Sequence, residues 1–331
     1  MYFELMPKEK EEDFYNYKNE LNRLLTSIKQ DRIIVVKGVR RVGKSSLMRV
    51  ARGKLDLPSV WVDGRTIYSK DVMYNQLERA LRRLVVLGSW SKKVEVKNID
   101  VFGIELQINQ EVDVSKAKGV IFVDEAQLLS DFGFDQWLGY VYDNLKDVRV
   151  VLAGSQVGLL EKLLGSKRMG GMKGRVFREI VMKPLTRELA VSFLLEGFSQ
   201  VGKRVDLKEV EDAVDTLGGL IGWLTYYGYE RLYSSHSEAM NNVKLKAREI
   251  LLDELETFLE HVRNKKAYLF LLKGCAMGLR RWEDLKNFLI ANNIGVSEGF
   301  VSKAIERLID YSFITRDLRL TDPLMKDLLL S

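Results

Sequence analysis

The sequence predicts an α/β fold with a parallel five-stranded sheet, followed by a helical lid domain and a C-terminal winged helix-turn-helix domain. Three observations lead to this prediction. An apolar, β-branched run at 32–37 leads through a glycine-bounded loop into a helix pattern. A second apolar run, at 119–123, ends in two acids and is typical of a strand buried on both faces. From residue 186 onward, the apolar residues recur at helical spacing.

Composition limits the classes of protein that the chain can represent. Its 331 residues suffice for two or three domains, and 46% hydrophobic with 30% charged residues describe a soluble globular protein. No apolar run approaches the roughly 20 residues that span a bilayer, and no signal peptide is recognised, so a cytoplasmic protein without membrane contact is expected. Cys275 is the only cysteine, which excludes an intramolecular disulfide and a cysteine-rich metal site. The net charge of +6 permits a nucleic-acid partner without establishing one.

The loop after the first predicted strand has the pattern of a phosphate-binding loop. Residues 38–45 fit G-x-x-x-x-G-K-[ST] between an apolar strand and a helix, a context that chance matches rarely provide. Backbone N–H groups at a helix N-terminus can surround a triphosphate, Lys44 adds a positive charge, and Ser45 offers a hydroxyl to Mg²⁺. The predicted nucleotide-binding residues are Gly38, Val39, Arg40, Arg41, Val42, Gly43, Lys44, Ser45 and Ser46.

The two acids after the apolar run at 119–123 are the second candidate for catalytic chemistry. They stand at the carboxyl end of a predicted strand, where α/β sheets bind ligands. We expect Asp124 to hold Mg²⁺ and Glu125 to polarise a water for attack on the γ-phosphate. The alternative is a strand followed by a solvated acidic turn. A base beside a metal ligand suits water activation better than phosphorylation of a small metabolite, so a small-molecule kinase is disfavoured.

The other core elements follow from local patterns. Apolar residues at helical spacing predict a helix near 21–28 and another near 73–84, and short apolar runs predict strands at 59–63, 149–155 and 178–182. Two β-like pieces in 92–112 predict an inserted hairpin to which no role is assigned.

Two further residues are candidates for catalysis. Ser155 ends the fourth predicted strand and is expected to sense the γ-phosphate or orient the water, with a helix N-cap as the equal alternative. Arg175 follows a glycine-rich loop at 170–174 and is expected to reach developing charge on the phosphates, with a plain surface arginine as the alternative.

The chain divides into three predicted domains. Residues 1–185 form the core, 186–263 the helical lid, and 264–331 a module with the helix and hairpin order of a winged helix-turn-helix. Its hairpin, the wing, is predicted at 313–316 and 318–321. The module has 11 lysines and arginines against 8 acids, which supports DNA contact only weakly. Docking of a protein, or autoinhibition, is the alternative role.

The combination of motifs resembles the archaeal ATPase family, a branch of the STAND class related to AAA+ ATPases. The resemblance rests on the phosphate loop, the block at 123–127, the Ala-Gly-Ser at 153–155, Gly174-Arg175 before a strand, the block at 218–224, and the closing Leu-Thr-Asp-Pro at 320–323. It implies a core sheet in which the strand bearing Ser155 lies between those of the phosphate loop and Asp124. Two positions depart from the family: Tyr17 replaces a usual arginine, and Ile221 replaces a usual proline, which puts the contacts to the nucleotide base in doubt.

The sequence therefore predicts a Mg²⁺-dependent protein that binds and hydrolyses ATP as a molecular switch, alternating between ATP and ADP. We expect ATP to close the lid and hydrolysis to release it. The alternative is an ATP-responsive DNA-binding regulator with negligible turnover. Expected partners are duplex DNA or a protein at the winged helix, and an ATP-dependent homo-oligomer.

Overall fold

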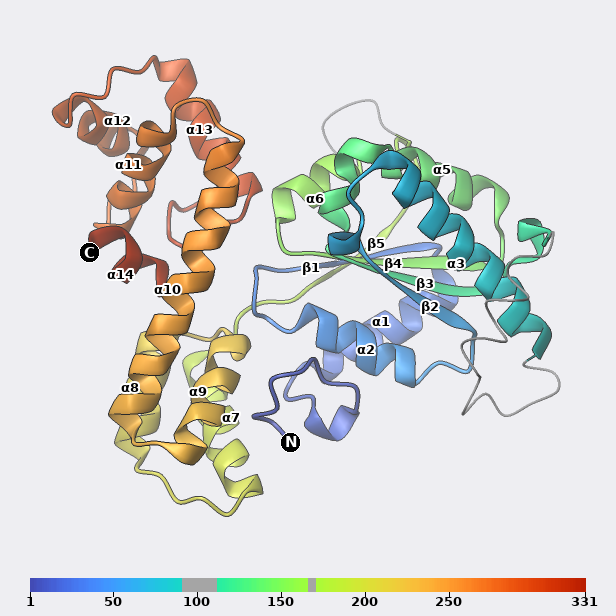
Figure 1. Ribbon diagram of the computed structural model, residues 1–331, viewed down its shortest axis with the longest axis horizontal. Coiled ribbons are helices and arrows are strands. Elements are labelled where there is room, and N and C mark those ends of the chain that lie inside the picture. The colour runs from blue at the N-terminus through green and yellow to red at the C-terminus, as the bar shows by residue number, and fades with distance from the viewer. Residues whose placement is uncertain (91–111, 166–170) are drawn as a thin grey trace.

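A single parallel sheet organises the first half of the protein. The computed structural model describes residues 1–90, 112–165 and 171–331 (Figure 1). The strands are β1 (Ile33–Lys37), β2 (Ser59–Asp63), β3 (Gly119–Asp124), β4 (Val148–Gly154) and β5 (Arg178–Val181). They pair in the order β2-β3-β4-β1-β5, all parallel. The five-stranded prediction is confirmed, and β4 lies between β1 and β3 as the family resemblance implied. The predicted hairpin insertion lies, except for residue 112, outside the described residues.

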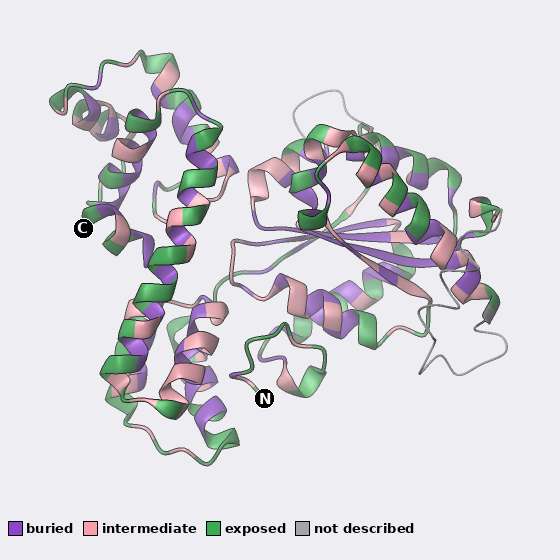
Figure 2. Ribbon diagram, in the orientation of Figure 1, coloured by how far each residue is buried: buried purple, intermediate pink, exposed green. Residues whose placement is uncertain are grey.

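Helices cover both faces of this sheet (Figure 1). On one face lie α1 (Lys18–Gln30) and α2 (Lys44–Gly53), and on the other α3 (Lys70–Trp90), α5 (Phe134–Asn144) and α6 (Val157–Leu163). Short 3-10 turns occur at Glu11–Asp13 (η1), Gly64–Thr66 (η2), Val114–Lys116 (η3) and Ala126–Phe132 (η4). Alternate residues of β1 enter the two cores: Ile34 joins the cluster with α1 and α2, and Val35 the cluster with α3 and α5. The three central strands, β1, β3 and β4, are therefore almost fully buried, while β5 at one edge is largely exposed (Figure 2).

Four helices form the lid, the name kept here for α7 (Arg187–Gln200), α8 (Leu207–Leu217), α9 (Ile221–Tyr233) and α10 (His236–Glu260). Helix α10 has 25 residues and reaches from the other lid helices to the C-terminal helices (Figure 1). Buried positions occur along its whole length, because its two halves pack against different partners (Figure 2). No helix in the described part of the chain is both long and apolar enough to cross a membrane.

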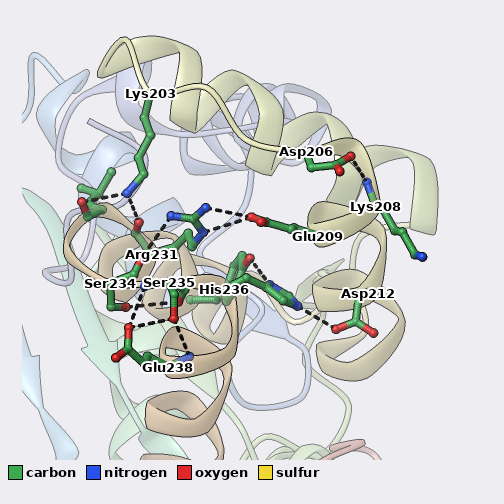
Figure 3. A network of polar contacts seen from close by, with 12 residues as sticks. Lys203, Asp206, Lys208, Glu209, Asp212, Arg231, Ser234, Ser235, His236 and Glu238 are labelled. Atoms are coloured by element: carbon green, nitrogen blue, oxygen red, sulfur yellow. Dashed lines mark hydrogen bonds and ion pairs between the residues drawn. The ribbon is translucent and has the colours of Figure 1, made fainter.

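Polar contacts fix the lid helices to one another (Figure 3). Arg231 of α9 pairs with Glu209 of α8 at 2.9 Å. His236, at the start of α10, lies 3.0 Å from Asp212 of α8, and Ser235 closes a capping box at the same helix end. Three helices thus share one polar network, which favours movement of the lid as a unit.

The C-terminal module consists of α11 (Lys265–Ala276), α12 (Trp282–Ala291), α13 (Glu298–Asp310) and α14 (Met325–Leu330). The helix order matches the prediction, but the two strands of the wing do not form. A single antiparallel bridge joins Ile314 to Leu320. Two backbone hydrogen bonds flank this bridge, from Thr315 N–H to Arg319 and from Thr321 N–H to Phe313, and Leu318 has φ 57°, which places it in the turn. The assignment as a winged helix stays a prediction, as do the domain boundaries.

Candidate nucleotide-binding site

The phosphate loop joins the buried strand β1 to helix α2 at the carboxyl edge of the sheet. A Cβ atom at Gly38 would lie 2.6 Å from the carbonyl oxygen of Met182, so the close approach requires glycine. Gly43 has φ 93°, in the left-handed region, and directly precedes the first turn of α2. The loop therefore brings successive backbone amides to a helix N-terminus, where phosphate oxygens are favoured.

The side chain of Lys44 is buried beneath this loop. Its Nζ donates hydrogen bonds of 2.8 Å to the carbonyl oxygens of Gly38 and Val39. Burial lowers the pKa of Lys44 to about 8, although the nearby Glu125 and Asp124 favour its charged form. A phosphate anion beside it would raise this pKa again, so the site is arranged to gain from binding an anion.

A hydroxyl and a carboxylate meet next to the loop. The Oγ of Ser45 donates a hydrogen bond of 2.7 Å to Oδ2 of Asp124, the last residue of β3. Burial raises the pKa of Asp124, and a divalent cation would oppose that shift. Hydroxyl and carboxylate oxygens are the hard ligands that Mg²⁺ prefers, so these two residues fit the predicted metal.

Glu125 follows Asp124 and is held from two sides. Oε2 of Glu125 accepts a hydrogen bond of 2.9 Å from Ser155 Oγ and one of 2.6 Å from Gln127 Nε2. Ser155 therefore points to the predicted base and does not cap α6, whose N-cap residue is Gln156. The structure brings Lys44, Ser45, Asp124, Glu125 and Ser155 together at one edge of the sheet.

All of these residues except Asp124 line a cavity of about 990 Å³ between the sheet edge, the N-terminal segment and the lid. Its size is at the upper end of the range for small-molecule and cofactor sites. The lining includes Lys44, Ser45, Glu125 and Ser155, and on the opposite side Ile221 of α9 and Glu254 of α10. A nucleotide here would touch both the core and the lid.

Comparison with known families agrees with this geometry. The model of a family described as an ATPase domain predominantly from Archaea matches residues 14–226. The chain belongs to this family. It is therefore an ATPase, as the sequence predicted, with the fold of a P-loop nucleoside triphosphatase. No curated protein matches the chain.

Solved structures extend the likeness beyond the family match. The Walker-type ATPase PABY2304 of Pyrococcus abyssi is 25% identical, with a TM-score of 0.85, and 100% of each chain is covered. The ORC2 protein of Aeropyrum pernix is 14% identical, with a TM-score of 0.50 over 90% of this chain and 84% of that one. At that identity, the second likeness shows the fold alone.

The two arginines of the phosphate loop turn out to contact other parts of the ATPase. Arg40 Nη1 lies 2.9 Å from Glu254 of α10. Arg41 lies 2.9 Å from the other oxygen of Glu254 and 3.1 Å from Oδ2 of Asp322, near the C-terminus. The backbone of both residues belongs to the loop, but in this structure their guanidinium groups bind carboxylates.

The side chains of Val42 and Ser46 also have neighbours within the protein. Val42 is fully buried in the core, and Ser46 Oγ accepts a hydrogen bond of 3.0 Å from the backbone N–H of Lys8. Contacts of Val42 with a nucleotide would therefore come from its backbone, whereas Ser46 also lines the cavity.

The structure does not bring Arg175 to the site of its own subunit. It precedes β5, whose first residue, Arg178, is level with Ile34 near the amino end of β1. The phosphate loop lies beyond the other end of these strands. Arg175 instead donates a 3.0 Å hydrogen bond to Asp143, at the end of α5. Only action on a neighbouring subunit stays a prediction for this residue.

Both departures from the family pattern border the cavity. Tyr17 is buried and donates a hydrogen bond of 2.7 Å to the carbonyl oxygen of Lys183, just after β5. Ile221 begins α9, and the next residue, Gly222, donates its backbone N–H to the carbonyl oxygen of Arg41 at 2.9 Å. A tyrosine hydroxyl thus ties α1 to the core, while a hydrophobic residue replaces the proline beside the loop.

Sequence reasoning missed three residues that bind the loop arginines: Glu254, Asp322 and Trp223. The ring of Trp223 lies 4.3 Å from the Arg41 guanidinium, and its Nε1 donates a 2.8 Å hydrogen bond to Asp322. Asp322 and Trp223 belong to motifs that carried the family resemblance, which was the available signal. Glu254 is one acid among many on a charged helix, so no local pattern distinguishes it.

Proposed function

We propose that this ATPase is a Mg²⁺-dependent molecular switch of the STAND type, in which the nucleotide controls the docking of the lid and the C-terminal module. Ser45 and Asp124 would hold the metal ion, which neutralises charge on the phosphates during transfer to water. Glu125 would polarise that water, and Lys44 would bind the phosphates. Lys44, Ser45 and Glu125 line one cavity, and Asp124 accepts the hydrogen bond of Ser45 beside it, which supports this part of the proposal.

One observation carries the switch: segments remote in sequence meet at Arg40 and Arg41. Glu254 comes from α10, Trp223 from the start of α9, and Asp322 from the segment before α14. The side chains of Glu254 and Asp322 are only 16% and 9% exposed. Any change in the conformation or charge of the phosphate loop therefore acts directly on the lid and the C-terminal module.

The ion pair between Arg41 and Asp322 is suited to release because burial of its carboxylate is unfavourable. Burial raises the pKa of Asp322 even though Arg41 opposes the shift, so the desolvation of this carboxylate outweighs its attraction to the arginine. Such a pair fixes geometry while adding little net stability. A triphosphate bound at the loop adds negative charge near both carboxylates, which weakens their hold on the arginines.

A second contact of the C-terminal module lies on the other side of the cavity. Val157 N–H, two residues after Ser155, donates a 3.0 Å hydrogen bond to Ser312 Oγ. Lys162 of α6 pairs with Asp310, the last residue of α13. The module thus touches both the phosphate loop and the helix that follows Ser155. Loss of the γ-phosphate is therefore expected to change docking at both places.

The partner of the C-terminal module is proposed to be a protein in preference to duplex DNA. Arg307 of α13 donates a 2.9 Å hydrogen bond to the carbonyl oxygen of His261, so it is used within the chain. Two acids of the same helix also form ion pairs, Glu298 with Lys286 and Asp310 with Lys162. A mobility shift of the full chain with duplex DNA, in 50 and 200 mM salt, tests the DNA alternative.

The switch is tested by measuring distances between the core and the C-terminal module. Spin labels on cysteines introduced at Asp56 and Ile290, both exposed, report the separation of the two parts. Cys275 is buried, and burial raises the pKa of its thiol to about 11, so the native cysteine should not take the label. The measurements with ATP use the Glu125→Gln variant, which is expected to bind ATP but to hydrolyse it on the order of a hundredfold more slowly.

We expect different distance distributions without nucleotide, with ADP and with retained ATP. Asp322→Asn should give an undocked distribution in every state, because the charge that binds Arg41 is lost. Asp327→Asn, on the exposed surface of α14, is the matched control and should behave as the parent. Identical distributions in all three nucleotide states would overturn the switch and leave ATP hydrolysis standing.

A further inference from the structure

We propose that Gln127 is a positioning residue for the catalytic base: its amide fixes one oxygen of Glu125 so that the other is presented to the attacking water. This inference rests on the proposed role of Glu125. Gln127 lies two residues after Glu125, in the 3-10 turn η4 that follows β3.

The hydrogen bonds to Glu125 are unevenly distributed between its two oxygens. Gln127 Nε2 and Ser155 Oγ both donate to Oε2, at 2.6 and 2.9 Å. Glu125 lines the cavity that also contains Lys44 and Ser45. With one oxygen held by two donors from two different segments, the carboxylate can rotate little, and its second oxygen is the one left to accept a proton.

The buried position of Gln127 is energetically unfavourable for the oxygen of its side-chain amide. It is 3% exposed, and its Oε1 is buried without a hydrogen-bond partner among the described residues. A Cβ atom at Gly154 would lie 2.5 Å from this oxygen, so the amide fits only because β4 ends in glycine. An unpaired buried carbonyl costs about 1–3 kcal/mol. An apolar side chain of the same size would avoid that cost, as its buried neighbours Ala126 and Leu129 do.

The backbone of Glu125 shows a second local cost. Its φ of 50° and ψ of 42° place a non-glycine residue in the left-handed region. Costs of this kind persist where the surrounding structure holds them for a function. The amide of Gln127 must turn its Nε2 toward Glu125, because only that nitrogen can donate a hydrogen bond to the carboxylate. The geometry therefore points to Gln127 as part of the arrangement that directs Glu125.

The test compares single-turnover and steady-state ATP hydrolysis, with Mg²⁺, for the full chain and its variants. Gln127→Met keeps the size of the side chain but removes the donor, and Gln127→Glu keeps its shape and replaces the donor with an acceptor. We expect both to lower kcat on the order of tenfold, with KM and ATP affinity unchanged. The melting temperature of Gln127→Met should not fall. Gln136→Met, on the exposed face of α5, is the matched control.

A double-mutant cycle with Glu125→Gln shows whether Gln127 acts through the base. In the Glu125→Gln background, Gln127→Met should have no further effect on kcat. If it lowered kcat there by the same tenfold, or if both Gln127 variants kept the parental rate while Glu125→Gln was slow, the inference would be wrong and the role of Glu125 would stand. A parental rate for Glu125→Gln itself would overturn both. If Gln127→Met failed to fold, Gln127→Glu alone would decide by the same criteria.

Discussion

The nucleotide site and the interdomain contact at Arg40 and Arg41 share one loop but are built in different ways. Lys44 and Ser45 belong to one short motif, and Asp124 and Glu125 end one strand. The contact at Arg41 needs Trp223, Glu254 and Asp322, which are spread over a hundred residues of sequence. The site is thus fixed by local chain geometry, while the contact exists only when the lid and the C-terminal module are docked. Variants at the two places should consequently differ in size and kind of effect.

The largest effect is expected from Lys44→Ala. Removing the buried ammonium removes the positive charge that binds the phosphates, so ATP affinity should fall on the order of a hundredfold or more. Because burial of this charge is costly, thermal stability should be retained. Titration calorimetry measures the affinity, with the exposed Lys183→Ala as a control. Unchanged affinity would remove Lys44 from the site.

Glu125→Gln should separate binding from chemistry. The amide keeps the shape of the side chain but cannot accept the proton of the water, so turnover should fall on the order of a hundredfold. ATP affinity should stay at the parental value. Single-turnover hydrolysis with a direct binding assay checks both, and a parental rate would move the search for the base elsewhere.

Asp124→Asn should change the metal dependence of the reaction. A neutral amide binds Mg²⁺ less well than a carboxylate, so the response of turnover to Mg²⁺ should shift to higher concentrations or disappear. The hydrogen bond from Ser45 can still form to the amide oxygen, so the fold should persist. A Mg²⁺ titration identical to that of the parent would contradict the assignment.

At the interdomain contact, Asp322→Asn should change turnover by less than tenfold. Removing one partner of a buried ion pair leaves the other charge less compensated, although Arg41 keeps Glu254, so the melting temperature should fall as the module undocks. The main effect should be a change in the coupling between nucleotide and docking. A hundredfold loss of turnover would show instead that Asp322 affects hydrolysis at the nucleotide site, and not only the docking of the C-terminal module.

The smallest effect is expected from Arg175→Ala. Its side chain pairs with Asp143 at the amino edge of the sheet, so the parental rate should be retained within one subunit. Its specific activity should match that of the parent at every protein concentration. A slow Arg175→Ala variant whose activity is restored by mixing with Lys44→Ala would instead show that the arginine serves a neighbouring subunit.

The sequence predicted which residues would meet at the carboxyl edge of the sheet because the motifs that carry them are local. A strand, a glycine-bounded loop and a helix follow one another at 33–53, and the two acids directly end β3. The placement of Arg175 was also accessible in principle, since a residue before a parallel strand lies at the edge opposite the ligand. The partners of Arg40 and Arg41 were not, because Glu254 has no distinguishing neighbours and its position depends on tertiary packing.

The alternating residues at 313–321 favour a hairpin, and the chain does turn back there: Ile314 bridges Leu320, and backbone hydrogen bonds join Thr315 to Arg319 and Thr321 to Phe313. The pairing is too short to give two full strands, because Leu318, with φ 57°, lies in the turn and not in the second predicted strand. Gln127 was visible in the sequence as part of a motif, yet only its distance to Glu125 indicates a role.

The continuity of helix α10 has a mechanical consequence. A straight helix of 25 residues is about 37 Å long, so a tilt of about 10° at its first turn would displace its last turn by about 6 Å. Glu254 lies in the last two turns, and the ring of Phe258, one turn further, makes an edge-on contact with Tyr311 and a tilted contact with Phe313 of the C-terminal module. In the proposed switch, helix α10 would act as a lever arm, and its length would set how far its last turn moves when the nucleotide changes.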